Sequence, residues 1–403
     1  TNGTRNMKTT MKTITRAVTL AVAGFGMASA NAATIGSTDV KYTGYIKVDG
    51  IYSDYSNGEG HPLNRDFYVP STIAVGASDD DIGGRFDGHA RQSRFRLTTN
   101  TPVDGGDSIT GVLELDFMIT KGDYDNERIS NSYLPRMRHA FLKYKNWLVG
   151  QTWTTFMDVG ALPESLDFIG TTDGITFGRQ VMVRYSQNGF DFALENPETT
   201  VVGVGATDDN SVPDIIGSYT HKADWGHVKV AGIFRQLSYN VNVTDDSGSI
   251  IGNIDASDTG MGISITSKVK LSDTDDLRFT FFTGSGLGRY AALNAAQGAV
   301  YNEETGSLDA IDSTGYGVAY RHMWTDKART SIMFSAFDAD AEQVTEVTMV
   351  DYTDKTYSAR VNYIYSMTKT VTVGAEYAYA KRETDAGLEG DMSRVQFSAK
   401  YAF

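Results

Sequence analysis

The sequence predicts an all-β fold: a transmembrane antiparallel β-barrel of about sixteen strands with an inward-folded third loop. Hydrophobic and polar residues alternate along many short segments, and short and long connections alternate between these segments. The chain has 41 Gly, 22 Tyr and 19 Phe but only 7 Pro, a composition that favours strands and tight turns. The mean hydropathy is −0.29 and no long apolar run follows residue 30, which excludes a membrane protein built from helices.

The N-terminal segment differs from the rest of the chain. A basic stretch ending at Arg16 precedes the apolar run 17–30, which closes on a pattern of small residues. This pattern is typical of a signal peptide, and the run is shorter than the ~20 residues that a spanning helix needs. We therefore expect residues 1–32 to hold upstream residues and a signal peptide, and residues 33–403 to form one outer-membrane β-barrel.

The C-terminal segment shows the alternation most clearly. One face carries Val395, Phe397, Ala399, Tyr401 and Phe403, and the other carries Arg394, Gln396, Ser398 and Lys400. An arginine that faces lipid at the midplane of a barrel costs about 2–4 kcal/mol, whereas a water-filled lumen solvates it. The charged face is therefore expected inside.

The same reading along the whole chain predicts sixteen strands, an even number as in bacterial barrels. They are expected at 39–53, 88–99, 107–119, 134–145, 146–152, 178–187, 189–197, 213–222, 225–239, 258–271, 274–285, 313–324, 327–339, 353–366, 369–383 and 390–403. The links between them alternate between short ones, expected on the periplasmic side, and long ones, expected outside. The long links are 54–87, 120–133, 153–177, 198–212, 240–257, 286–312, 340–352 and 384–389.

The third long link is the most informative for function. It is partly apolar and contains four carboxylates, Asp158, Glu164, Asp167 and Asp173. We expect it to fold into the lumen, to narrow the pore, and to place these carboxylates opposite arginines of the wall. The alternative is an external loop that packs at a subunit interface.

Arginines on the predicted inner face supply the other half of such a constriction. They are Arg94, Arg96, Arg136, Arg138, Arg184, Arg360 and Arg394. Arginine stays charged and presents a planar fork that fits carboxylate and phosphate groups, so this wall would favour small anions. Glu114 and Asp116, on the strand between the two arginine pairs, offer another interpretation, in which the arginines only form cross-strand ion pairs.

Several classes of function are disfavoured. The net charge of −14 argues against nucleic acid as a partner, because binding a polyanion needs basic stripes. The sequence has no Cys, no GxSxG, no zinc motif and no phosphate-binding loop, and its six His show no metal-ligand spacing. We expect no enzyme activity, no cofactor and no metal site, and acidic external loops that meet lipopolysaccharide through divalent cations.

Five stretches carry a resemblance to a known family. They are Met137 to Phe141, Gly150 to Asp158 and Leu162 to Phe168, together with Phe67 to Ser71 and His89 to Leu97 in the first part of the chain. These stretches resemble the DcaP-like porins over roughly the first half of the mature chain.

The resemblance implies a trimer of sixteen-stranded outer-membrane porins of Gram-negative bacteria, with small anionic solutes such as dicarboxylates as substrates. Position by position, it implies a constriction loop that carries Asp158, Glu164 and Asp167. It likewise implies that the wall facing this loop carries Arg94, Arg96 and Arg138. It also implies that the terminal Phe403 belongs to the signal read by the barrel-assembly machinery.

The sequence thus predicts a passive diffusion porin that favours small anions and uses no cofactor. Two alternatives stay open at this point. One is an unselective or cation-preferring porin, which the acidic total charge would permit. The other is a structural or adhesion barrel whose lumen is blocked.

Overall fold

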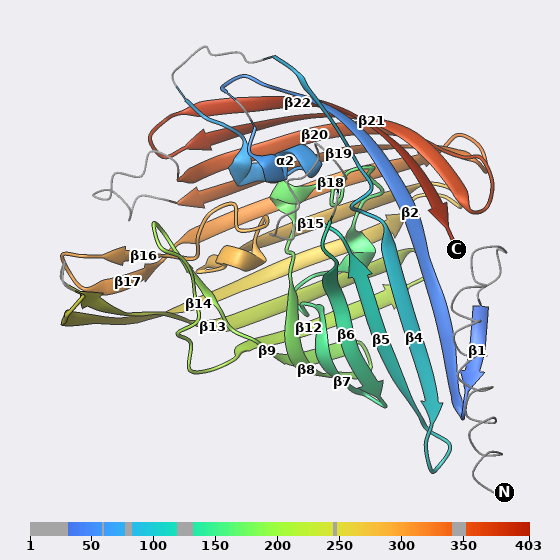
Figure 1. The fold of residues 1–403 in the computed structure, drawn as a ribbon, viewed down its shortest axis with the longest axis horizontal. Helices are drawn as coiled ribbons and strands as arrows, with labels where there is room; N and C mark the ends of the chain where they lie inside the picture. The colour runs from blue at the N-terminus through green and yellow to red at the C-terminus, as the bar shows by residue number, and fades with distance from the viewer. Residues whose placement is uncertain are drawn as a thin grey trace, which may run out of the picture.

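The computed structural model is a closed β-barrel, with long connections gathered at one end (Figure 1). The structure describes residues 31–58, 60–76, 83–118, 131, 133–244, 248–340 and 352–403. The signal peptide expected within residues 1–32 lies almost wholly outside the described residues. The short strand β1 (Asn31–Ile35), at the predicted start of the mature chain, pairs with β2.

Fifteen continuous strands and one interrupted strand form the wall, which confirms the predicted sixteen-stranded antiparallel barrel. The continuous strands are β2 (Thr38–Tyr55), β5 (Ser108–Asp116), β6 (Arg136–Tyr144), β7 (Trp147–Trp153), β8 (Arg179–Gln187), β9 (Phe190–Glu195), β12 (Asp214–Ala223), β13 (Gly226–Thr244), β14 (Ile250–Lys270), β15 (Asp276–Ser285), β18 (Asp312–Met323), β19 (Ala328–Asp340), β20 (Thr353–Ser366), β21 (Val371–Thr384) and β22 (Glu389–Ala402). The interrupted strand consists of β3 (Arg85–His89) and β4 (Arg94–Pro102), which both pair with β2.

The barrel closes where β22 pairs antiparallel with β2. At the end of this seam the backbones of Gly44 and Phe403 exchange two hydrogen bonds of 3.0 Å. The Phe403 ring also stacks on Tyr42, with ring centroids 5.6 Å apart. The chain terminus is therefore part of the closure, and no strand edge is left open there.

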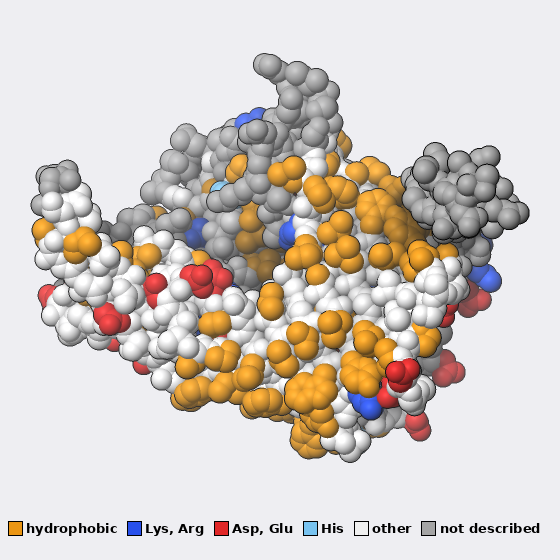
Figure 2. Space-filling view, turned by 60° about the horizontal axis from the view of Figure 1, so that its bottom comes forward, with side chains coloured by type: hydrophobic (Ala, Val, Ile, Leu, Met, Phe, Trp, Pro, Cys, Tyr) orange, Lys and Arg blue, Asp and Glu red, His pale blue; other side chains and the backbone are white. Residues whose placement is uncertain are grey.

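The two faces of the wall have the polarity that the alternation predicts. Large hydrophobic side chains point outward and stay exposed, as on β22, where Phe397 is 60% exposed. Their strand neighbours Arg394, Gln396 and Ser398 are buried inside. Figure 2 shows hydrophobic side chains spread over the outer wall, with acidic side chains toward its margins. Such a surface fits a lipid environment.

Two external regions differ from the predicted loops. The predicted link 240–257 is wrong, because β13 and β14 continue as one long hairpin well beyond the predicted strand ends. The sequence does alternate at 240–243, as Asn-Val-Asn-Val, but the stretch after it is acidic and contains Gly, so the sequence pattern predicts a loop for the whole segment. Beside this hairpin, the fourth and sixth links form a small sheet of β10 (Thr199–Val201), β11 (Gly205–Thr207), β16 (Ala299–Asn302) and β17 (Ser307–Ala310).

The remaining helical elements are short. They are α2 (Pro62–Asp66), η2 (Pro70–Thr72), η4 (Val159–Ala161), η5 (Thr172–Gly174) and η6 (Gly288–Tyr290). Among the described residues, no helix is long and apolar enough to cross a membrane.

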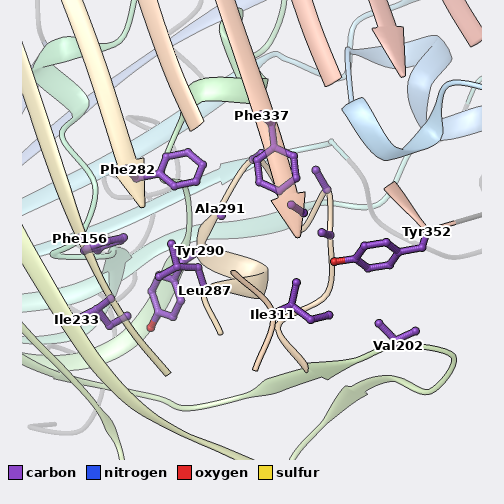
Figure 3. Close-up of a cluster of buried hydrophobic side chains, with 14 of the residues drawn as sticks. Phe156, Val202, Ile233, Phe282, Leu287, Tyr290, Ala291, Ile311, Phe337 and Tyr352 are labelled. Carbon is purple, nitrogen blue, oxygen red and sulfur yellow. The ribbon is translucent and has the colours of Figure 1, made fainter. Parts of the chain in front are cut away.

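A hydrophobic cluster lies inside the barrel, where loops meet the inner wall (Figure 3). It joins Phe156 of the third loop and Tyr290 of the sixth loop to wall residues such as Phe282 and Phe337. Two backbone hydrogen bonds of 2.9 Å link these loops, from Phe177 N–H to the Tyr290 carbonyl and from Ala292 N–H to the Ile175 carbonyl. The loops thus form a packed layer across part of the lumen.

Candidate functional site

The third loop (residues 154–178) connects β7 to β8 and runs inside the barrel, as expected. Asp173 is its most deeply buried anchor, with no exposed surface. The carboxylate accepts hydrogen bonds from four hydroxyls: Tyr68 at 2.7 Å, Ser335 at 2.8 Å, Thr356 at 2.6 Å and Ser358 at 2.5 Å. Because these hydroxyls come from the first loop, β19 and β20, one carboxylate fastens the third loop to all three.

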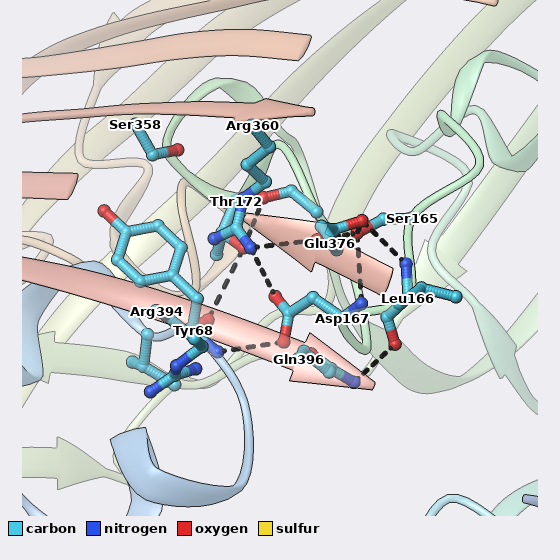
Figure 4. Close-up of polar contacts among 12 residues, drawn as sticks. Tyr68, Ser165, Leu166, Asp167, Thr172, Ser358, Arg360, Glu376, Arg394 and Gln396 are labelled. Carbon is cyan, nitrogen blue, oxygen red and sulfur yellow. Dashed lines mark hydrogen bonds and ion pairs between the residues drawn. The ribbon is translucent and has the colours of Figure 1, made fainter. Parts of the chain in front are cut away.

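A second anchor lies around Glu376 on β21 (Figure 4). Its carboxylate accepts hydrogen bonds from the Leu166 backbone N–H at 2.8 Å and from the Ser165 hydroxyl at 2.8 Å. Arg360 lies 3.4 Å from both Glu376 and Asp167. The buried guanidinium therefore joins a loop carboxylate to a wall carboxylate.

The other two carboxylates of the loop also contact the wall. Glu164 accepts two hydrogen bonds from Arg329, at 2.7 and 2.5 Å. Asp158 accepts hydrogen bonds from His227 at 2.7 Å and from Thr266 at 2.8 Å. All four carboxylates thus contact strands between β13 and β21. Asp167 pairs with Arg360, one of the predicted wall arginines, but among the described residues none of the four pairs with the predicted arginines of β4 and β6. Hydroxyl and basic side chains of these later strands satisfy them.

The arginines of β4 and β6 form what we name the first basic cluster: Arg94, Arg96, Arg136 and Arg138 around Glu114 and Asp116. Arg136 and Arg138 make close pairs of 2.7–2.8 Å with the two carboxylates. Arg94 and Arg96 lie farther from Glu114, at 3.4 and 3.5 Å, and the Arg96 side chain is 41% exposed. The cross-strand ion pairs that the sequence left open are present, yet four guanidinium groups share two carboxylates.

A second basic cluster, which sequence reasoning missed, lies on the opposite wall: Lys268, Arg278, Arg321 and Arg329 around Asp276 and Glu164. Arg321 bridges both carboxylates, at 2.6 Å from Asp276 and 3.7 Å from Glu164. Arg278 also donates to the Leu162 carbonyl of the third loop. The signal was available, because all four basic residues occupy inward positions of predicted strands.

The three remaining predicted wall arginines have different surroundings. Arg360 and Arg394 are almost fully buried. Arg394 donates to the Ser53 hydroxyl at 2.9 Å and to the Asn64 carbonyl of the first loop, so it holds that loop in place. Arg184 is half-buried on β8, five residues after the strand begins.

No group of three or more His, Cys, Asp or Glu among the described residues has the arrangement to hold a metal ion.

Solved structures with this fold are outer-membrane channels and porins. The outer membrane channel DcaP of Acinetobacter baumannii superposes with a TM-score of 0.74 at 23% identity, covering 92% of this chain and 99% of that one. An anion-selective porin from Comamonas acidovorans gives 0.55 at 12% identity, covering 91% of this chain and 100% of that one. OmpT of Vibrio cholerae in a trimer form gives 0.51 at 15% identity, with the same coverages.

No curated protein matches the sequence. The family model of the DcaP outer membrane protein matches residues 16–403, which is nearly the whole chain. This match agrees with the closed sixteen-stranded barrel and with the inward third loop. The chain belongs to the DcaP outer membrane protein family and has the porin fold of an outer-membrane channel.

Proposed function

We propose that this protein is a passive diffusion channel that favours small anions such as dicarboxylates. The observation that carries the proposal is the surplus of cations at the third loop. The first and second basic clusters each place four cations around two carboxylates, and both clusters contact the loop. A solute passing here meets fixed positive charge in a narrow, partly desolvated space, which lowers the barrier for anions.

The total charge does not oppose this proposal, although it is −14. Selectivity depends on the charges that face the path, because charges more than a Debye length of about 8 Å away are largely screened. Many acidic residues lie on external loops, such as Asp208 and Asp209 in the fourth link. The porin from Comamonas acidovorans, which shares the fold, is an anion-selective one.

We extend the proposal to assembly and surroundings. OmpT of Vibrio cholerae, with the same fold, has a trimer form, which supports a homotrimer here. The exposed hydrophobic outer wall supports insertion among the lipids and lipopolysaccharide of a Gram-negative outer membrane, after export by the signal peptide and folding by the barrel-assembly machinery.

Planar-bilayer recording in a salt gradient tests the channel and its preference. We expect a reversal potential on the anion side. Arg94 and Arg96 make the longest ion pairs of the first basic cluster. The double variant Arg94→Ser, Arg96→Ser should shift the reversal potential toward cation preference. The matched control removes two external cations, Lys355 and Lys381, by the same change to serine, and should leave the potential unchanged.

Three outcomes contradict the proposal in different ways. A protein that folds but never conducts would be a structural or adhesion barrel with a blocked lumen. The loops packed inside the barrel are the feature that would block it. A cation-side reversal potential in the natural protein contradicts the anion preference. An unchanged potential in the Arg94 and Arg96 variant assigns these two residues to wall ion pairs alone.

A further inference from the structure

A row of alternating aromatic and arginine side chains lines the base of the third loop. Trp153 ends β7 and Arg179 begins β8, and the strand register pairs these two residues directly. The Arg179 guanidinium lies 4.5 Å from the centroid of the Trp153 ring and 5.5 Å from that of the Phe177 ring. Arg179 is thus in contact with two rings at the point where the loop leaves and rejoins the wall.

The row continues into the first basic cluster. The Arg138 guanidinium lies 5.4 Å from the Trp153 ring and 5.5 Å from the Phe168 ring. Arg136 follows at 5.6 Å from Phe168. We name this set the arginine–aromatic row; its members in order are Phe177, Arg179, Trp153, Arg138, Phe168 and Arg136.

Arg179 differs from the other two arginines of the row. Arg136 and Arg138 are paired with Glu114 and Asp116. Among the residues that the structure describes, Arg179 has no hydrogen-bond acceptor and no carboxylate within ion-pair distance, and its Nη1 is buried without a partner. The charges that act on it include Arg138 and Arg136, which have the same sign, and Asp116, which has the opposite sign. Asp116 is already paired with Arg136 and Arg138, so Arg179 has no carboxylate of its own, and an incoming anion would supply one.

We propose that Arg179 is the solute-binding residue of the channel, and that its ligand is the carboxylate group of a small organic acid. This inference rests on the proposed anion preference and deepens it. A guanidinium in contact with rings keeps its N–H edge for binding, and that edge fits a carboxylate through two parallel hydrogen bonds. The contact with Trp153 and Phe177 fixes the plane of the Arg179 guanidinium before the solute arrives, which reduces the loss of side-chain entropy on binding.

The test titrates succinate into the natural channel and into an Arg179→Gln variant, during single-channel recording in potassium chloride. We expect saturable block of the chloride current, with a half-blocking concentration raised at least about tenfold in Arg179→Gln, as expected for lost charge-assisted hydrogen bonds. Arg179→Lys keeps the charge but loses the fork, and should give an intermediate value. It also covers the case in which the glutamine variant does not fold.

Two controls separate this site from general electrostatics. Lys143→Gln removes a cation from another position of the wall, and should leave the half-blocking concentration of succinate unchanged. Inorganic phosphate replaces succinate in a parallel titration, and block by phosphate that is equally sensitive to Arg179 overturns the assignment to carboxylates. Equal succinate block in the natural channel and in Arg179→Gln overturns the inference itself. A natural channel without anion preference refutes the proposed function instead, so the two failures are distinguishable.

Discussion

An arginine in this barrel takes its role from its partners and its exposure. Arg138 is almost fully buried and contacts both Glu114 and Asp116, so its charge is balanced locally. Arg96 makes one loose contact with Glu114 and is 41% exposed, so more of its charge reaches the lumen. Arg360 and Arg394 are inward-facing too, yet they hold loops. Inward position alone therefore does not make an arginine part of the pore surface.

Glu164 gives a prediction at this scale, because it balances two cations of the second basic cluster. Glu164→Gln keeps the side-chain shape but removes the charge that Arg329 and Arg321 share. We expect the anion-to-cation permeability ratio to rise roughly twofold, a modest change because lumen water and salt screen the added charge. Reversal potentials in a salt gradient measure it. Asp209→Asn on an external loop serves as the control and should leave the permeability ratio unchanged. A fall in the ratio after Glu164→Gln would contradict the role of the second basic cluster in anion preference.

The third loop is held as an element by polar contacts on one side and by aromatic contacts on the other. Its carboxylates and carbonyls bind the wall from β13 to β22, while Phe168 and Phe177 contact arginines on β6 and β8. These attachments lie outside the backbone ladder of the barrel. Loss of one of them should therefore free part of the loop without opening the sheet.

Asp173 is the contact whose loss should affect this element most. A hydrogen bond to a charged group contributes about 1.5–3 kcal/mol to stability. Asp173 accepts four such bonds from side chains, and they hold the third loop in place. In Asp173→Ala we expect a larger and noisier single-channel conductance, because the loop is released from β19 and β20. The thermal transition of the barrel should change little. A conductance identical to that of the natural channel would show that the loop keeps its place without this anchor.

The strands could be predicted from the sequence, whereas the packing of the loops could not. Alternation is periodic, so segments such as 313–324 and 353–366 correspond closely to β18 and β20. The sequence pattern does not show which strands the third-loop carboxylates contact. These contacts depend on hydroxyls such as Ser335 and Ser358, which are distant in sequence. Arg179 was missed for the same reason. It opens a strand beside an irregular loop, and its significance comes from rings that only the fold brings to it.

At the scale of the whole molecule, charge is separated between the path and the outside. The chain carries a net charge of −14, yet the two basic clusters and Lys400 concentrate cations around the third loop. The closed ladder makes this possible, because it holds basic side chains from several strands around one lumen. Under the proposed anion preference, selectivity would depend on these clusters, whereas the stability of the barrel depends on the closed ladder.

The last strand links closure to assembly and gives a prediction for the whole barrel. Phe403 pairs with Gly44 through its backbone, and its ring contacts Tyr42 at 5.6 Å and Phe95 at 6.3 Å between ring centroids. Phe403→Ala keeps the backbone pair but removes the rings' contact, whereas Tyr401→Ala removes an aromatic from the same face, two residues earlier. We expect the phenylalanine change to lower the yield of folded barrel in cells several-fold, and the tyrosine change to have a smaller effect.

Refolding both variants into detergent separates recognition from stability, with folded protein measured by its heat-dependent migration in a denaturing gel. If Phe403 acts as a signal to the assembly machinery, the Phe403→Ala barrel should refold in detergent nearly as well as the natural one. An equal loss in cells and in detergent would instead assign the residue to the seam. The ring contacts with Tyr42 and Phe95 would then explain why the chain ends on an aromatic residue.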